Sequence, residues 1–158
     1  MEEQKELPLR LGVGIILLNH ENKIFVGKRI DNPKKFWQMP QGGVNKNESF
    51  LSAARRELEE ETGITSIKIL KELDEWFAYD LPKNLIGKIW KGKYRGQKQK
   101  WFIMQFLGQN KEINIKTQNP EFLDWKWIES FELTSVAVNF KINIYSKLLK
   151  KLISLKLN

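Results

Sequence analysis

Three glutamates, Glu57, Glu60 and Glu61, are spaced so that their carboxylates can meet on one side of a helix. Positions three and four apart share a face, and these three fall within about one third of the circumference. Carboxylates held so close raise one another's pKa unless a positive charge lies among them. A divalent cation that prefers oxygen ligands meets this need, and Mg²⁺ or Mn²⁺ is expected. The alternative is a solvated acidic helix face.

The helix that carries these acids has recognisable ends. It is expected to begin after Asn47 or Ser49, either of which can cap the free amide groups of the first turn. Gly63 suits the left-handed conformation that ends many helices, so the helix should stop there. A stripe of apolar side chains beside the acids should dock the helix, and it consists of Leu51, Ala54 and Leu58.

The loop before the helix is expected to fold back onto it. Arg56 and Glu48 are too far apart in the sequence to meet within one helical turn, so a pair between them requires this fold. The whole stretch 42–64 reads GGVNKNESFLSAARRELEEETGI and resembles the Nudix box at every defined position. These positions are Gly42, Glu48, Arg56, Glu57, Leu58, Glu60, Glu61, Gly63 and Ile64.

The resemblance to Nudix hydrolases implies a fold and a catalytic set. The implied fold is an α/β/α sandwich with a central mixed β-sheet. Glu57, Glu60 and Glu61 would bind the metal together with Gly42, and Glu121 would add a carboxylate from across the cleft. Arg56 joins the three box glutamates in the expected catalytic set. Glu57 is the favoured general base, with Glu61 and Glu121 as alternatives.

Composition points to one globular domain over residues 1–158, of which 41% are hydrophobic. The absence of cysteine excludes disulfides and thiolate metal sites. The start of the chain, MEEQKELPLR, has no apolar core of a signal peptide, and no run approaches membrane-spanning length, so a cytoplasmic protein without a membrane partner is expected. The net charge of +8 favours polyanions such as RNA or nucleotides, although solubility alone could explain it. Nothing identifies a stable protein partner.

Hydrophobic patterning predicts strands that alternate with loops before a closing helix. The expected strands are 9–18, 23–29, 36–39, 67–73, 76–81, 101–107, 113–115 and 122–128. From Val138 onward, apolar residues recur at helical spacing, which predicts an amphipathic helix packed on the sheet. A mixed sheet between helices, and so an α/β class, follows from this order.

A basic loop is expected over residues 82–100. It contains seven Lys and Arg residues and no acidic residue, with Trp90 and Tyr94 between them. This spacing suits phosphate contacts and base stacking, and an ordinary solvated loop is the alternative.

Segments outside the box bear on the substrate. They resemble bacterial RNA pyrophosphohydrolases and the related dinucleoside polyphosphate hydrolases, and are 37–43 (WQMPQGG), 79–82 (YDLP), 96–102 (GQKQKWF), 120–127 (PEFLDWKW) and 138–145 (VNFKINIY). The implied phosphate-facing residues are Arg10 and Arg29, with Lys98 and Lys100 guiding the anion. The implied pocket for the 5′ nucleobase comprises Tyr79, Val138 and Phe140, with Lys141 beside it. The loop 30–36 is longer than in these relatives, so no phosphate contact is assigned to it.

Three functions remain open. The first is an RNA pyrophosphohydrolase that converts 5′-triphosphate ends to 5′-monophosphate ends and so starts mRNA decay. The second keeps this chemistry and acts on dinucleoside polyphosphates. The third is a non-catalytic RNA-binding protein, against which the intact set of carboxylates argues. Phe140 likewise has two possible roles, as a core residue at the head of a helix or as a surface on which a base stacks.

Overall fold

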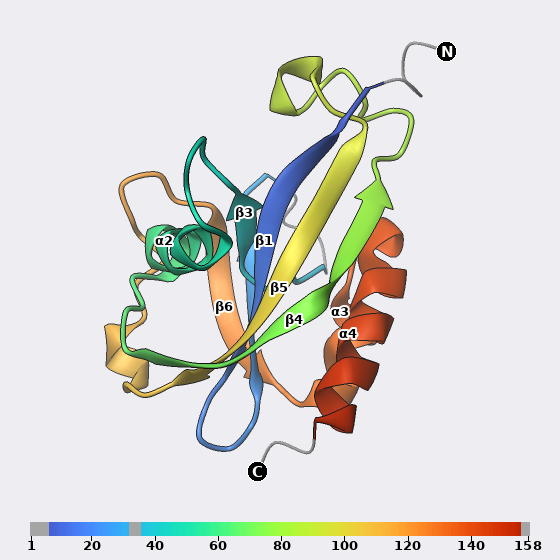
Figure 1. Cartoon of the computed structure of the whole chain (residues 1–158). Helices are drawn as coiled ribbons and strands as arrows, with labels where there is room; N and C mark the ends of the chain where they lie inside the picture. Colours follow the sequence, from blue (N-terminus) through green and yellow to red (C-terminus); the bar gives the residue numbers. More distant parts are fainter. Residues whose placement is uncertain (1–6, 32–35, 156–158) are drawn as a thin grey trace.

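A mixed sheet with helices on both faces forms the framework of the computed structural model, which describes residues 7–31 and 36–155 (Figure 1). Its strands are β1 (Leu9–Leu18), β2 (Ile24–Arg29), β3 (Gln41–Gly43), β4 (Ile67–Asp80), β5 (Gly96–Phe106) and β6 (Phe122–Ile128). The α-helices are α2 (Phe50–Thr62), α3 (Leu133–Val136) and α4 (Ile142–Ser154). Short 3₁₀ helices are η1 (Trp90–Gly92), η2 (Asn110–Glu112), η3 (Ser130–Glu132) and η4 (Asn139–Lys141). The expected α/β sandwich with a central mixed sheet is confirmed.

The sheet runs in the order β4-β5-β1-β2-β6, with β3 paired to β1. The β1–β5 pair is parallel, whereas the other pairs are antiparallel. Residues 38–43 lie between β1 and β2. Gly27 and Gln38 exchange both backbone hydrogen bonds, at 2.8 and 2.9 Å, and the Ile15 amide donates to the Pro40 carbonyl at 2.9 Å. This insertion separates the two strands and leaves room for a cleft.

Each face of the sheet has its own core, because successive side chains of a strand point to opposite faces. On one face, Ile16 and Leu18 of β1 pack with Tyr145 and Leu148 of α4. On the other, Ile15 and its neighbours pack with residues of α2, namely Ala53, Ala54 and Leu58. Burial on both faces explains why β1 reads as a continuous apolar run.

Both ends of α2 agree with the sequence-based prediction. The Ser49 hydroxyl accepts a hydrogen bond from the Ser52 amide at 3.1 Å, so Ser49 is the cap and Asn47 is not. Gly63 has a φ of 73° and its amide donates to the Glu59 carbonyl. Such left-handed backbone is strained for residues with a Cβ, which explains the glycine.

Two expected strands are absent from the described residues. Residues 36–39 form only a bridge at Gln38, and the strand lies further on, at β3. The Met39 amide donates instead to the Tyr145 hydroxyl, and Pro40 has no amide proton to give. Residues 113–115 follow η2 without forming a strand, because the Asn114 amide donates to the Thr62 carbonyl at the end of α2, at 2.8 Å, and not to a neighbouring strand.

Three other boundaries differ from the prediction. The expected strands 67–73 and 76–81 are one strand, β4, which stays continuous through irregular pairing with β5. The basic loop ends where β5 begins at Gly96, so Lys98 and Lys100 belong to a strand. The final helix, α4, begins at Ile142 after a 3₁₀ turn. Most of the long loop 30–36 lies outside the described residues.

Tyr145→Phe tests how α4 holds the segment between β1 and β2. The Tyr145 hydroxyl, on a side chain 1% exposed, accepts from the Met39 amide at 2.9 Å. Its loss leaves a buried amide without an acceptor, so we expect the free energy of unfolding to fall by about 1–3 kcal/mol in urea denaturation. Tyr94→Phe is the control, because the Tyr94 hydroxyl makes no hydrogen bond within residues 7–31 and 36–155. Equal stabilities of the two variants would contradict the anchor role.

Candidate functional site

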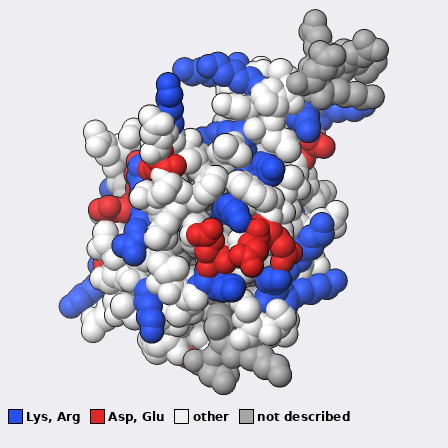
Figure 2. Space-filling view, viewed as in Figure 1, with Lys and Arg blue, Asp and Glu red and all other residues white. Residues whose placement is uncertain are grey.

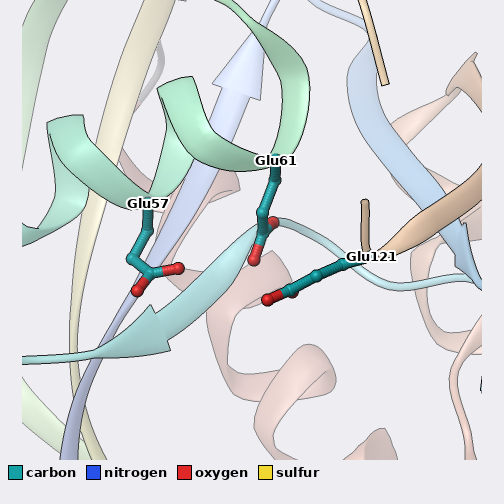
Figure 3. Close-up of side chains that lie close together, drawn as sticks. All are labelled: Glu57, Glu61 and Glu121. Carbon is teal, nitrogen blue, oxygen red and sulfur yellow. The ribbon is translucent and has the colours of Figure 1, made fainter. Parts of the chain in front are cut away.

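Three carboxylates from two parts of the chain converge at one end of α2 (Figure 3). Glu57 and Glu61 lie one turn apart on the helix, and Glu121 reaches toward them from the residue before β6. One oxygen of each lies within 4.8 Å of those of the other two. The backbone carbonyl of Glu121 accepts from the Ile30 amide at 2.9 Å, which fixes it at the end of β2.

Glu57 and Glu61 are buried, and Glu121 is partly exposed. Glu61 is 1% exposed, and neither of its carboxylate oxygens has a hydrogen-bond partner among the described residues. Burial, followed by the nearby Glu121, raises the pKa of Glu61 well above its ordinary value. Burial also raises the pKa of Glu57, and the Arg56 guanidinium opposes this rise. Unpartnered oxygens at this distance fit a divalent cation that prefers oxygen ligands.

Arg56 ties the glycine loop to the helix. Its Nε donates to Glu48 at 2.8 Å, which confirms the expected pair. Its Nη1 donates to Glu57 Oε1 at 2.8 Å, and its Nη2 donates to the Gly43 carbonyl at 2.8 Å. Hydrogen bonds from Arg56 and from the Asn45 amide lower the pKa of Glu48 to about 2. One guanidinium therefore fixes the loop and one oxygen of Glu57 together.

Glu60 and Gly42 occupy different places around the cluster. The Glu60 side chain is 58% exposed and lies 3.2 Å from Arg56, so the structure does not bring it among the three acids. Its role as a metal ligand stays a prediction. A Cβ at Gly42 would lie 2.0 Å from the Glu57 carboxyl carbon. Only glycine therefore allows the loop to pass so close to this side chain, while metal binding at Gly42 also stays a prediction.

A cleft of about 710 Å³ opens beside the acids. Its lining includes nine of the residues predicted from the sequence: Arg10, Arg29, Gly42, Glu57, Tyr79, Glu121, Val138, Phe140 and Lys141. These residues come from distant parts of the chain, so the fold assembles much of the predicted site in one cavity.

The two arginines of the cleft have different partners. Arg29 donates from Nε and Nη2 to the two carboxylate oxygens of Asp31, both at 2.7 Å. The Arg10 guanidinium lies 5.2 Å from the centroid of the Trp90 ring, and a Cβ at Gly43 would come within 2.3 Å of its Nη2. Within the described part of the chain Arg10 makes no ion pair, which leaves its donors available to an anion.

An aromatic pair forms another wall of the cleft. The rings of Tyr79 and Phe140 lie 5.6 Å apart, and the Tyr79 hydroxyl donates to Gln97 at 3.1 Å. Burial raises the pKa of Tyr79 to about 12. Phe140 is half-buried, contacts the core beneath α4 and lines the cleft, so both roles considered for it are compatible with its position.

Lys141 lies beneath this wall and is 6% exposed. Its ammonium group donates to Gln38 Oε1 at 3.2 Å. Burial, with repulsion from Arg29, lowers the pKa of Lys141 to about 7. A buried amine of this kind can gain or lose its charge near neutral pH.

Lys98 and Lys100 do not line the cleft. Their ammonium groups lie 4.7 and 5.1 Å from the ring of Trp76, and Lys100 also donates to the Asp74 carbonyl at 2.9 Å. Both alternate along β5 with Gln97 and Gln99, which hydrogen-bond on the opposite face. Their guidance of an anion stays a prediction.

Several cleft residues carried no role in the sequence-based prediction. They are Asp31, Phe36, Trp37, Gln38, Gln41, Leu81, Leu85 and Ile89. Trp37, Gln38 and Gln41 belong to the stretch WQMPQGG. Trp90 also lines the cleft, and base stacking was the role expected for it in the basic loop. Asp31 follows Arg29 by two positions, but nothing in the sequence shows that the two side chains pair.

The surface is basic on the view of Figure 2, where Lys and Arg spread over the face and Asp and Glu gather in a few groups. This agrees with the net charge of +8. No helix within residues 7–31 and 36–155 combines the length and apolar character needed to cross a membrane.

Comparison with known proteins gives close sequence relatives. A family model of the NUDIX domain matches residues 8–148. An RNA pyrophosphohydrolase of Pelagibacter ubique is 59% identical over 150 residues, which are 95% of each chain. One from Rickettsia typhi is 49% identical over 150 residues, 95% of this chain and 93% of the relative.

Solved structures share the fold at lower identity. An Ap4A hydrolase complex from C. elegans superposes with a TM-score of 0.65 at 21% identity, covering 92% of this chain and 99% of that one. The E. coli dihydroneopterin triphosphate pyrophosphohydrolase gives a TM-score of 0.68 at 16% identity, covering 91% and 99%. The extent of the family match and the identity to these relatives together show that the chain belongs to the Nudix hydrolase family.

Proposed function

We propose that this protein is an RNA pyrophosphohydrolase, which hydrolyses a phosphoric anhydride bond at the RNA 5′ end to leave a 5′-monophosphate. The observation that carries the proposal is the cluster of three carboxylates, two of them buried, at a cleft that also holds arginine and aromatic side chains. The names of relatives 59% and 49% identical to this chain support the choice of RNA. We further propose a single domain over residues 1–158 that works in the cytoplasm on RNA or nucleotides, in the decay of mRNA.

Glu57, Glu61 and Glu121 would hold the divalent cation, which we propose is Mg²⁺ or Mn²⁺. Glu60 is a further proposed ligand, and the Gly42 backbone completes the proposed set. When bound, the cation supplies positive charge that offsets the negative charge of the phosphate oxygens. These charges repel an incoming nucleophile, so their neutralisation is a main requirement of the reaction.

Arg10 and Arg29 would bind the 5′ phosphates. Arg10 has donors available beside the glycine loop, and a guanidinium can hold two phosphate oxygens at once. Arg29 is already paired with Asp31, so its contribution is a positive charge shared with that carboxylate. Both residues line the cleft with Glu57, which supports binding of the phosphates beside the acids.

Glu57 is our candidate for the general base. Arg56 holds Glu57 Oε1, which orients the carboxylate and leaves Oε2 to take a proton from water. Burial raises the pKa of Glu57, and a carboxylate with a raised pKa is a better proton acceptor near neutral pH. Glu61 and Glu121 remain the alternatives, since they share the cluster.

The aromatic wall would bind the 5′ nucleobase. Tyr79 and Phe140 offer ring surfaces to a base, Val138 adds an apolar contact, and Lys141 lies alongside. The same wall could accept the adenine of a dinucleoside polyphosphate, and this makes such compounds the second candidate substrate.

A direct competition decides between the two substrates. Wild-type protein with Mg²⁺ is given equal concentrations of a short 5′-triphosphate RNA and diadenosine tetraphosphate in one tube. We expect the RNA to be converted faster to its 5′-monophosphate form. Faster loss of the dinucleotide would move the function to nucleotide turnover, and RNA binding without hydrolysis of either substrate would indicate a non-catalytic protein.

Substitution of the carboxylates tests the metal and base assignments. Glu57→Gln, Glu60→Gln, Glu61→Gln and Glu121→Gln should each lower kcat by roughly a hundred-fold or more, because each removes a charged ligand or a proton acceptor. Glu59→Gln is the control, since this exposed side chain lies outside the cluster. Wild-type turnover by folded Glu60→Gln would remove Glu60 from the metal set and leave the other three in place.

The raised pKa of Glu61 also makes the stability of the folded protein depend on pH. Its pKa is raised in the folded protein, so between the unfolded and folded pKa values the folded state binds more protons. The contribution of Glu61 to stability is therefore lost as pH rises through this window. Without metal, Glu61→Gln should raise the Tm at pH 8 and have little effect near pH 4. Added Mg²⁺ or Mn²⁺ should stabilise wild type more than the variant, and equal shifts of Tm would contradict the role of Glu61 as a ligand.

A further inference from the structure

A second cluster of like charges lies at the edge of the cleft, and it is positive. The ammonium groups of Lys28 and Lys126 lie 4.9 and 4.3 Å from the ring centroid of Trp37. Lys28 comes from β2 and Lys126 from the neighbouring strand β6, while Trp37 lines the cleft. The pairing of β2 with β6 thus brings Lys126 to the same aromatic ring as Lys28.

The two lysines outnumber the acid beside them, Asp124. Neither lysine forms an ion pair with a carboxylate in the part of the chain that the structure describes. Asp124 is the cross-strand partner of Lys28, but its carboxylate accepts from the Trp125 amide at 2.8 Å instead. The electron-rich ring face attracts both ammonium groups, which offsets part of their mutual repulsion. An anion between the two ammonium groups would offset the repulsion that is left.

The position of the cluster indicates which anion would bind. The cleft has the size of a site for one small ligand, so a longer nucleic acid must leave it. The Trp37 amide donates to the Val136 carbonyl at 2.8 Å. This hydrogen bond holds Trp37 next to Val138, a residue of the proposed nucleobase pocket. Arg10 lies at Trp90 instead, on the segment between β4 and β5. A chain leaving the nucleobase wall would therefore pass Trp37.

We propose that Lys28, Trp37 and Lys126 form a second binding site for the phosphodiester backbone of RNA downstream of the nucleotide in the cleft. The inference rests on the proposed RNA substrate and extends it. A dinucleoside polyphosphate has no phosphodiester there, so this lysine pair favours RNA over the smaller substrate. Single-stranded nucleic acid is commonly held by such a combination of cations and aromatic rings.

The test is the double variant Lys28→Gln/Lys126→Gln, studied with a 5′-triphosphate octanucleotide and with diadenosine tetraphosphate. We expect kcat/KM for the octanucleotide to fall about ten-fold through KM, with little change for the dinucleotide. Anisotropy of the labelled octanucleotide should show weaker binding. The salt slope of log K should become shallower by about 1.4, the value for two lost contacts to a single strand.

Two further variants separate charge from structure. Lys147→Gln/Lys150→Gln removes the same charge from exposed positions on α4, outside the cleft, and should leave both substrates unaffected. Lys28→Arg/Lys126→Arg keeps the positive charges and should restore binding of the octanucleotide.

Three outcomes would overturn the site. The first is an unchanged kcat/KM for the octanucleotide in the double variant. The others are an equal loss of kcat/KM in the α4 control pair, or an equal loss for diadenosine tetraphosphate. Lys98→Gln/Lys100→Gln could instead lower kcat/KM for the octanucleotide alone, with no effect of Lys28→Gln/Lys126→Gln. That result would also overturn the proposed site and favour a path of the RNA over the other face of the sheet. Failure of wild type to hydrolyse RNA would reject the proposed function separately, and the anisotropy measurements would still support or reject the site.

Discussion

The geometry of the acidic site depends on the hydrogen bonds of the Arg56 guanidinium. It bonds at once to Glu48, to the Gly43 carbonyl and to Glu57. These contacts join the glycine loop to the helix that follows it and orient one catalytic candidate. Gly42 makes the arrangement possible, because a side chain there would collide with Glu57. The position of Glu57 therefore depends on the close passage of the loop.

The sheet provides the space into which this unit faces. Residues 38–43 separate β1 from β2, and the Tyr145 hydroxyl holds Met39 from the opposite layer. Both faces of the sheet are closely packed, so the inserted segment lies between two hydrophobic cores. The α4 layer therefore supports the site although most of its side chains do not touch the cleft.

Clusters of like charge occur at two places beside this cleft. The three clustered carboxylates favour a cation, and Lys28 with Lys126 favours an anion. In each case the fold holds groups together that would separate in water, and a ligand of opposite charge relieves the repulsion. For a Nudix hydrolase these preferences match a metal ion and a phosphorylated substrate.

The sequence by itself determined the elements whose signals are local. These include the span of β1, the capped helix α2, strand β6, and the pairing of Arg56 with Glu48. Apolar periodicity, capping residues and a fixed motif spacing act over short stretches, so they can be read without the fold. Residue spacing also placed Glu57 and Glu61 on one helix, and the resemblance added Glu121 from across the cleft.

Only the tertiary structure decided which side chains share a space. Lys98 and Lys100 face away from the cleft, because the strand begins at Gly96 and its register fixes which face each residue takes. Glu60 points to solvent while Glu61 is buried, and Asp31 accepts from Nε and Nη2 of Arg29. Trp37 meets two lysines from neighbouring strands. Such contacts depend on strand pairing between distant segments, and no local pattern in the sequence specifies that pairing.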